Sequence, residues 1–429
     1  MKYYSTKNTT LRKSFQEAVI EGLPADNGLY MPEMIPPLVP EFFQQMQQLS
    51  LQELAFLLME QYVGKEIEEE ALWQIIGKTF DFDFPLVQLD ERNLALELYH
   101  GPSYAFKDVG ARFLANCLDH FYRDSSEKCT ILVATSGDTG GAVAAAFAET
   151  KNAEVVILYP SGKVSELQEK QLTTFDKNVT ALEIQGDFDD CQRMVKAAFL
   201  DADLRKQKNI SSANSINVAR FLPQMVYYFV PYFYFNLDIK LAFSVPSGNY
   251  GNLTAGLFAQ QMGLPIHQFL AASNVNDTVP RYLSNGLFDP KPTIATYANA
   301  MDVSVPSNFL RMQDMFTYEA LKERIKGYAF TDDDIVYQMK ELLAKEEYLL
   351  DPHGAVGYAA LKAHEAEGNH DVGILLETAH PCKFMDVVGK LTDADIYPEE
   401  AKLLMQKEKK SIKMAADEQL LKDFLLSKG

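Results

Sequence analysis

The feature that most constrains the fold is an alternation of short apolar runs and helical segments that begins near Leu86. Thr130–Ala134, Val155–Leu158 and Val179–Ile184 have the length of buried strands, and each is followed by a polar or glycine-containing loop and a helical stretch. This strand–loop–helix pattern, repeated three times, predicts a parallel sheet covered by helices. Ligands of such sheets bind at the loops after the carboxyl ends of the strands, so functional residues are expected there.

The pattern resumes in the second half of the chain. Lys240–Val245, Ile266–Ala272 and Val372–Glu377 are further strand candidates. A chain of 429 residues is long enough for two to three domains at ~150 residues each. The fold class predicted from the residues is therefore α/β, with two domains built on parallel-rich sheets.

The first ninety residues follow a different pattern. A polar turn leads into a helix with Ser14 as a possible cap, Gly28–Pro32 is a short extended piece, and residues 41–80 are mostly helical. Core packing accounts for their apolar residues, so we expect no chemistry in this region.

Composition excludes several classes of protein. The chain has 40 basic and 59 acidic residues, a formal charge of −19, which argues against nucleic acid or an anionic membrane as a partner. Any anionic ligand must therefore meet a local positive site. The four cysteines have no metal spacing, the seven histidines are dispersed, and no segment resembles a signal peptide or a membrane span. We expect a cytoplasmic, soluble protein with reduced thiols and no metal.

Two loops after predicted strands are suited to binding an anion or a cofactor. Ser136–Gly141 combines glycines with the hydroxyls of Ser136 and Thr139, although many strand–helix turns are glycine-rich for steric reasons alone. Pro246–Asn252 is the best phosphate cradle in the chain, because two glycines with small amides stand at a strand-to-helix junction. Neither loop is a Walker A motif.

Lys107 is the candidate nucleophile. It follows a Gly-Pro turn and precedes the amphipathic run Ala111–Phe121, which places it in the first turn of a predicted helix. The positive end of the helix dipole and burial both favour the neutral amine, and a neutral amine forms Schiff bases. The alternative is an ordinary surface lysine whose stem lies on Phe106.

A third polar segment opens the predicted helix at residues 213–230. Asn214, Ser215 and Asn217 stand at its start, and Arg220 follows about one turn later. One interpretation is helix capping by Asn214 or Ser215. The other is an anion clamp in which Arg220 offers a bidentate fork.

Taken together and in order, these motifs resemble the threonine synthase family. The segments that carry the resemblance are Ser103–Asp108, Ser136–Gly140, Asn214–Asn217, Gly248–Asn252 and Thr378–Pro381, and Ser14–Ala18 and Gly28–Pro32 also match the N-terminal region of that family. The similarity covers nearly the whole chain. It implies a pyridoxal-phosphate enzyme of fold type II, the fold of the tryptophan synthase β subunit, with an N-terminal extension at 1–90, a lysine-bearing α/β domain at 91–235 and a larger α/β domain at 236–429, and chain crossovers between the domains.

The resemblance also implies site residues. Lys107 would hold pyridoxal phosphate covalently, Asp138 would lie near its ring hydroxyl, and Thr378 would contact its pyridine nitrogen. The cofactor phosphate would be cradled by Gly248, Asn249, Tyr250, Gly251 and Asn252. A second anion site for the substrate would be formed by Ser136, Thr139, Lys163, Asn214, Ser215 and Arg220. Lys163 and Arg220 would supply the local positive charge that the acidic composition requires.

The substrate of this family is O-phospho-L-homoserine. The implied enzyme is a carbon–oxygen lyase acting on phosphates, which removes phosphate from Cγ and adds water at Cβ to give L-threonine, the last step of threonine biosynthesis. Lys107 is the natural base for the Cα proton. We expect a monomer or a homodimer.

Rival readings remain open. The closest are a threonine or serine dehydratase, a cysteine synthase, or a relative that cleaves phosphohomoserine or phosphothreonine to an oxo acid. The rival from another class is a non-catalytic module that binds a phosphorylated ligand.

Overall fold

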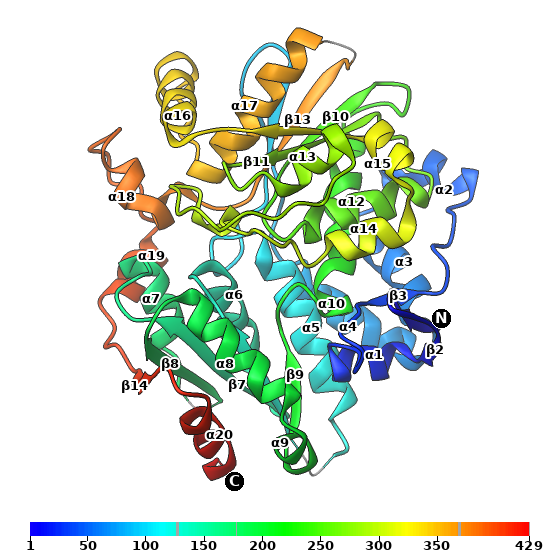
Figure 1. Ribbon diagram of the computed structural model, residues 1–429. Helices are drawn as coiled ribbons and strands as arrows, with labels where there is room; N and C mark the ends of the chain where they lie inside the picture. The colour runs from blue at the N-terminus through cyan, green and yellow to red at the C-terminus, as the bar shows by residue number, and fades with distance from the viewer. Residues whose placement is uncertain (126–127, 177, 368–369, 429) are drawn as a thin grey trace.

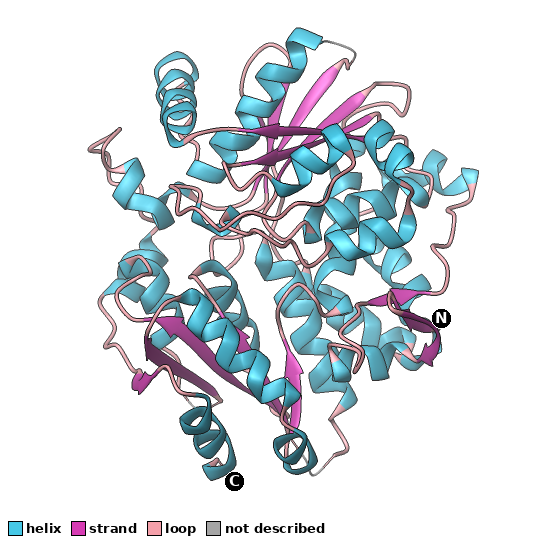
Figure 2. Ribbon diagram, in the orientation of Figure 1, coloured by secondary structure: helices cyan, strands magenta, loops and turns pink. Residues whose placement is uncertain are grey.

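The computed structural model describes residues 1–125, 128–176, 178–367 and 370–428. Two sheets, one of five strands and one of six, form the centres of two layered α/β units, and helices cover both sheets (Figure 1; Figure 2). No helix in the described part of the chain is long and apolar enough to cross a membrane.

The five-stranded sheet contains the three strands that the alternation predicts. Its order is β14-β8-β7-β6-β9, and every pairing in it is parallel. The strands are β6 (Cys129–Ala134), β7 (Ala153–Pro160), β8 (Val179–Gln185), β9 (Asn209–Ser212) and β14 (Ile412–Ala415).

Helices cover this sheet on both faces, because successive strand residues point to opposite sides. Ile131 and Val133 of β6 pack in the core that includes α5 (Lys107–Phe121) and α6 (Asp138–Phe147). Leu132 packs in the core that includes α8 (Phe188–Leu200) and α20 (Glu418–Ser427). Helix α7 (Glu166–Thr173) packs beside α6.

The six-stranded sheet has the order β12-β11-β10-β13-β5-β4. Only the pairing of β4 (Leu86–Gln88) with β5 (Asn93–Glu97) is antiparallel in this sheet, as far as it is described. The remaining strands are β10 (Leu241–Pro246), β11 (Gln268–Ser273), β12 (Ile325–Ala329) and β13 (Val372–Glu377). Helix α12 (Gly251–Gln261) packs in the core on one face, and α16 (Asp332–Glu346) and α17 (Pro352–Glu367) pack in the core on the other.

Each of the two sheets pairs strands that lie far apart in the sequence. Strand β5 lies next to β13, nearly 280 residues later in the chain (Gly373 pairs with Asn93). Strand β14 returns to the five-stranded sheet and pairs with β8. Between them the C-terminal segment, drawn orange to red in Figure 1, runs from one sheet to the other through η6 (Pro381–Phe384), α18 (Met385–Val388) and α19 (Glu399–Met405). The domain boundaries 91–235 and 236–429 remain a prediction. Each sheet contains strands from before residue 235 and strands from after residue 236.

The N-terminal region packs against the middle of the molecule. Its strands are β1 (Tyr3–Ser5), β2 (Asn8–Lys13) and β3 (Tyr30–Pro32), and its longer helices are α1 (Phe15–Glu21), α2 (Pro40–Gln45), α3 (Leu51–Val63) and α4 (Glu69–Thr79). Ser14 caps α1 through a capping box, as predicted. Residues 8–13 form a strand paired with β1 rather than a polar turn.

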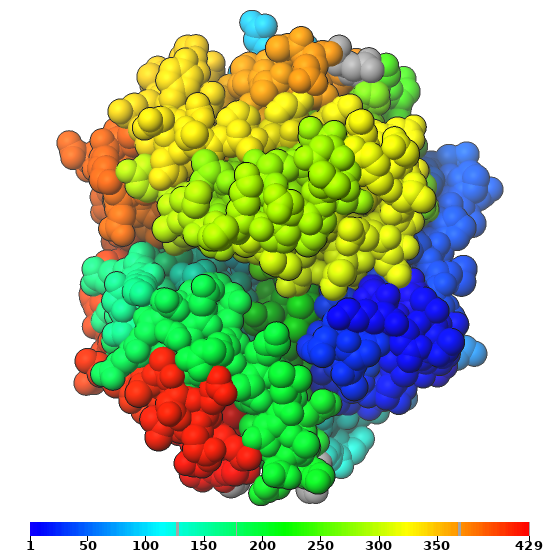
Figure 3. Space-filling view, viewed as in Figure 1, coloured from blue at the N-terminus to red at the C-terminus, as the bar shows by residue number. Residues whose placement is uncertain are grey.

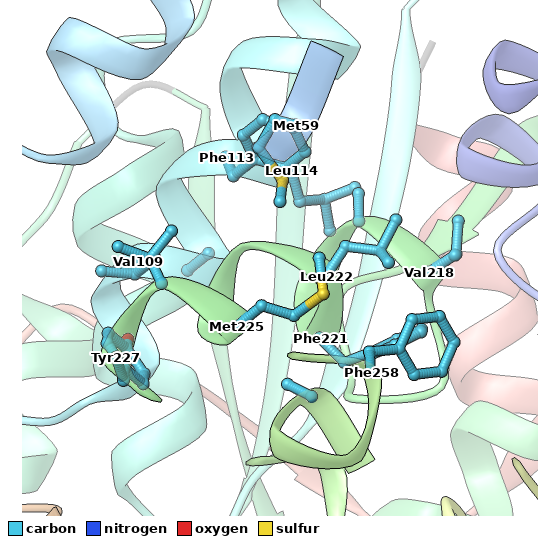
Figure 4. Close-up of a cluster of buried hydrophobic side chains, with 14 of the residues drawn as sticks. Met59, Val109, Phe113, Leu114, Val218, Phe221, Leu222, Met225, Tyr227 and Phe258 are labelled. Atoms are coloured by element: carbon cyan, nitrogen blue, oxygen red, sulfur yellow. The ribbon is translucent and has the colours of Figure 1, made fainter. Parts of the chain in front are cut away.

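A buried cluster joins this region to the site-bearing elements (Figure 4). The cluster includes Met59 of α3, Phe113 and Leu114 of α5, and Phe221 and Phe258, whose ring centres lie 5.1 Å apart. Apolar packing along α5 therefore fixes the position of the residue that begins this helix, Lys107.

The segment at 213–230 is not the single helix that its sequence predicts. It forms α10 (Val218–Phe221), η3 (Leu222–Gln224), α11 (Met225–Phe229) and η4 (Val230–Phe233), and Pro223 stands in the first 3-10 turn. The cap is Asn217, whose side chain accepts a hydrogen bond from the Ala219 amide, and not Asn214 or Ser215. Asn214 and Ser215 are thereby left outside the helix.

Candidate active site

Lys107 is the first residue of α5 and lies beside the end of β13. The amide of Phe106 donates to the Thr378 carbonyl at 2.8 Å, and the amide of His380 donates to the Tyr104 carbonyl at 3.0 Å. This short antiparallel contact brings Thr378 next to the residue that precedes Lys107. The prediction that Lys107 stands in the first turn of a helix is confirmed.

The Lys107 side chain is largely removed from water. It is 17% exposed, and its Nζ lies 5.3 Å from the centre of the Phe106 ring. Burial lowers the pKa of the Lys107 ammonium, Asp138 opposes that shift, and the charges of Lys383 and Arg220 add to it. The surroundings therefore favour the neutral amine, which is the nucleophilic form.

Asp138 faces Lys107 from the other sheet. Its Oδ2 lies 3.7 Å from Lys107 Nζ, and its Oδ1 accepts a hydrogen bond from Gln168 Nε2 at 3.0 Å. The turn after β6 requires Gly137, which has φ 140° and whose Cβ would lie 2.4 Å from the Gln168 side chain. Burial opposes ionisation of Asp138, yet Lys383 and Lys107 hold the pKa of its carboxyl well below the usual value.

Lys383 is a site residue that the sequence reading missed. It lies in η6, five residues after Thr378, and its side chain is fully buried. Its Nζ is 2.9 Å from Asp138 Oδ1. The sequence indicates Lys383 only as a lysine that follows the polar segment after a core strand. Its partner Asp138 is 245 positions away in the sequence, so local residues do not predict the pair.

The loop after β10 has the geometry of an anion cradle. Gly248 approaches the Ala300 carbonyl so closely that a Cβ would lie 2.3 Å from that oxygen. Tyr250 adopts a left-handed conformation (φ 60°), and its hydroxyl lies 2.9 Å from Ser273 Oγ. Helix α12 starts at the next residue, and the Tyr250 side chain does not cap it, so N–H groups of its first turn are available to a ligand. The loop also carries Asn252, whose buried Nδ2 has no partner among the described residues.

The segment around Asn214 meets that loop. Asn308 links them, because its Nδ2 donates to Ser215 Oγ at 3.1 Å and its backbone amide donates to the Asn249 carbonyl at 3.2 Å. The buried Arg220 donates to the Ala213 carbonyl, while its Nε has no partner in the described part of the chain. The structure thus brings Ser215 to the loop after β10, and Arg220 lies on the Ala213 carbonyl, directly before Asn214 in the chain.

Arg311 is a second cation that the sequence reading missed. It is fully buried, it lies 4.3 Å above the Phe221 ring, and it donates to the carbonyls of Ser215 (3.3 Å) and Ile216 (2.6 Å). Burial lowers the pKa of Arg311 to about 9. These acceptors are neutral, so the guanidinium keeps a positive field directly behind the Ser215 segment.

The remaining predicted residues lie on the five-stranded sheet. Ser136 and Thr139 flank Asp138 and are half-buried, whereas Lys163 is exposed in the turn after β7. In Figure 3 the surface is hollowed between the green helices of that sheet and the lime-coloured loops of the other unit. No group of three or more metal-ligating side chains converges anywhere in the described residues.

The residues at this edge fit pyridoxal phosphate. The buried Lys107 amine, whose pKa is lowered, can bond to the aldehyde of the cofactor. The loop at Gly248, where only a residue without a Cβ fits, can bind the phosphate of the cofactor through backbone N–H groups. Some of the buried polar atoms that lack a partner in the described chain lie in these segments: Asn214 Oδ1, Arg220 Nε and Asn252 Nδ2. Unpaired buried polar groups are costly, and a bound polar ligand would satisfy them.

Comparison with known proteins gives a consistent result along the chain. A family profile described as "Pyridoxal-phosphate dependent enzyme" matches residues 84–377. Profiles described as "Threonine synthase N terminus" and "Threonine synthase, C-terminal" match residues 2–80 and 354–425.

Full-length relatives agree with the profiles. The chain is 43% identical to the threonine synthase of Escherichia coli over 390 residues, 90% of each chain. Its fold matches the crystal structure of an E. coli threonine synthase with a TM-score of 0.92 and 40% identity, covering all of both chains. It also matches the pyridoxal-phosphate-bound threonine synthase of Brucella melitensis with a TM-score of 0.93 and 34% identity, covering 100% of this chain and 99% of that one. A serine racemase from maize shares the fold at a TM-score of 0.56 and 14% identity, over 73% of this chain and 93% of that one.

Proposed function

Since the chain belongs to the threonine synthase family and is a pyridoxal-phosphate-dependent enzyme, we propose that it converts O-phospho-L-homoserine and water into L-threonine and phosphate at the site around Lys107. The observation that carries this proposal is the meeting of two polar segments, each suited to an anion, at the sheet edge that bears one buried amine. Asn308 ties the Ser215 segment to the Asn249 loop, and Lys107 stands at the same sheet edge. One segment suits the phosphate of the cofactor and the other suits the phosphate of the substrate.

The cofactor would be held by three parts of the chain. Lys107 would bind it covalently, the N–H groups of residues 248–252 would hold its phosphate, and the Thr378 hydroxyl would face its ring nitrogen. A neutral hydroxyl at that nitrogen leaves it largely unprotonated, unlike an acidic partner. Asp138 would lie beside the ring hydroxyl.

When bound, pyridoxal phosphate supplies an electron sink for negative charge that develops on the substrate carbon atoms. The protein supplies the proton transfers and the binding. Lys107, whose ammonium pKa is lowered by burial, would accept the proton from Cα. Its apolar neighbour Phe106 and the packed start of α5 keep bulk water from that amine.

The substrate phosphate needs positive charge in a protein whose formal charge is −19. Arg220 and Arg311 lie in or directly behind the segment that carries Asn214 and Ser215. Ser136, Thr139 and Lys163 would approach from the other sheet. As the phosphate leaves Cγ, donors already in place stabilise the charge that develops on its oxygens.

Lys107→Ala tests the proposal. Wild-type enzyme with phosphohomoserine should release threonine and phosphate in equal amounts, and Lys107→Ala should lose turnover by at least a factor of about 10⁴, a loss expected when a nucleophile and base are removed together. Circular dichroism should show an intact fold. Borohydride should trap cofactor on Lys107 of the wild-type protein.

Two outcomes would overturn the assignment. One is cofactor trapped on another lysine. The other is turnover of free threonine or serine with no threonine formed from phosphohomoserine, which would make the enzyme a dehydratase.

A further inference from the structure

Lys383 makes three contacts through its buried ammonium group. Nζ lies 2.9 Å from Asp138 Oδ1, 2.7 Å from the Ser103 carbonyl and 3.1 Å from Gln171 Oε1. An ammonium has three N–H donors, so each donor has a partner. Burying a charge is costly unless it is paired and hydrogen-bonded, and these contacts satisfy both conditions.

Asp138 divides its two oxygens between two lysines. Oδ1 receives Lys383 and Gln168, while Oδ2 faces Lys107 at 3.7 Å. The shorter, fully hydrogen-bonded contact is the one to Lys383. The carboxylate is therefore committed to Lys383, and Lys107 has only the longer contact.

We propose that Lys383 is a positioning residue of the active site, which neutralises and orients Asp138 so that this carboxylate does not hold the Lys107 amine in its charged, unreactive form. The proposal rests on the role of Lys107 in the proposed function. One carboxylate lies between two lysines, and its shorter contact is the one to Lys383, so its charge is directed at Lys383 more than at Lys107.

The other charged groups around the pair fit this arrangement. Arg220 adds positive charge near Lys107. The buried Asp108 lies near Lys383, where its Oδ2 accepts a hydrogen bond from the Ser103 amide at 2.9 Å. Burial raises the pKa of Asp108 to about 6, so this second carboxylate adds negative charge on the side of Lys383 above that pH.

A purely structural role is the competing account. Lys383 follows β13 of the six-stranded sheet, and its partners Asp138 and Gln171 belong to helices α6 and α7 of the other unit. Loss of an inter-unit contact would lower stability. It would not change the protonation of Lys107, and that difference separates the two accounts.

The test uses the cofactor-free protein and an amine-reactive label, so it does not depend on activity. Apoenzyme is exposed to a trace of acetic anhydride between pH 6 and 11, and acetylation of each lysine is followed by mass spectrometry. The labelling midpoint of Lys107 is compared among wild type, Lys383→Gln, Lys383→Arg and Lys345→Gln. Lys345 is an exposed lysine paired with Glu341, so its variant removes one charge far from the site.

We expect the Lys107 midpoint to rise by about one pH unit in Lys383→Gln, the size of shift that one nearby charge produces. At pH 8 this corresponds to a roughly tenfold lower labelling rate. Lys383→Arg and Lys345→Gln should leave the midpoint unchanged. An unchanged midpoint in folded Lys383→Gln, with only a lower melting temperature, overturns the proposal.

Wild-type protein alone gives a second test if Lys383→Gln does not fold. The labelling midpoint of Lys107 must then lie below that of the exposed Lys345, and a Lys107 midpoint at or above that of Lys345 overturns the proposal. Neither measurement uses phosphohomoserine. A failure of the proposed reaction would instead appear in the product assay, so the two failures are distinguishable.

Discussion

Replacing Gly248 with alanine should weaken cofactor binding without unfolding the protein. A Cβ at this position would lie 2.3 Å from the Ala300 carbonyl oxygen and 3.2 Å from Met301 Cα. Contacts of a Cβ below 3.0 Å essentially do not occur, so the two backbones must separate by at least 0.7 Å, the difference between 3.0 and 2.3 Å. Neither obstacle is a flexible side chain, and the displacement must therefore move the loop.

The size of the effect follows from the hydrogen bonds that this loop offers. A hydrogen bond to a charged group contributes about 1.5–3 kcal/mol, and its strength falls steeply as it lengthens and bends. If two such bonds to the cofactor phosphate lose about half their strength, the loss is roughly 1.5–3 kcal/mol. At about 1.4 kcal/mol per tenfold change, the dissociation constant rises roughly 10- to 100-fold.

The assay is an absorbance titration of apoenzyme with pyridoxal phosphate, together with a melting curve. Gly77→Ala is the matched control, because Gly77 lies inside α4 and an added Cβ there meets nothing within 4 Å. That control should keep cofactor affinity and gain about 0.5–1 kcal/mol of stability from the higher helix propensity of alanine. The reasoning fails if Gly248→Ala binds cofactor within threefold of wild type.

Two further predictions concern stability. Arg311→Met removes a buried guanidinium and leaves carbonyls without donors, so the free energy of unfolding in urea should fall by about 3–5 kcal/mol; a fall below 1 kcal/mol would contradict this account. Burial, and then the nearby His364, lower the pKa of His370 to about 4 from an ordinary value of about 6.5. Since the unfolded chain binds that proton more readily, stability should drop as pH falls from about 6.5 towards 4. In His370→Phe the decrease in urea midpoint between pH 7 and pH 5 should be smaller, and an equal decrease in both proteins would exclude His370 as a cause.

Local sequence was sufficient for the parts of the fold with a strong periodic signal. The strands near 130, 155, 179, 240, 266 and 372 and the capping of α1 by Ser14 are confirmed. Because parallel strands end at one edge, their loops could be expected to gather around Lys107. Thr378 and Asp138 do lie there, while the ligand contacts assigned to the site residues remain predictions.

Short polar strands could not be read from their own residues. β9 (Asn209–Ser212) has only one large apolar residue, Ile210. β14 (Ile412–Ala415) has a lysine between its two large apolar residues, Ile412 and Met414. Each becomes a strand because a neighbouring sheet edge supplies its hydrogen bonds. Asn217 was expected in the helix-opening segment, and its side chain caps α10 while its Nδ2 donates to the Val19 carbonyl, a distant partner that local sequence does not report.

The two missed cations have a common physical reason. A lysine or an arginine is almost always solvated, and only a partner supplied by a distant segment changes that. For Lys383 the partner is Asp138, and for Arg311 the partners include the Ser215 and Ile216 carbonyls. No local pattern in the sequence reports such a pairing.

The position of β5 between β4 and β13 has a consequence for the nascent chain. Asn93 leaves the ribosome about 280 residues before its partner Gly373, an interval of roughly 14–56 s at ~5–20 residues per second. Throughout that time one edge of β5 has no strand to pair with, and an open strand edge promotes association with other chains. The six-stranded sheet can be completed only near the end of translation, so this enzyme depends on protection of an N-terminal strand until its C-terminal partner is synthesised.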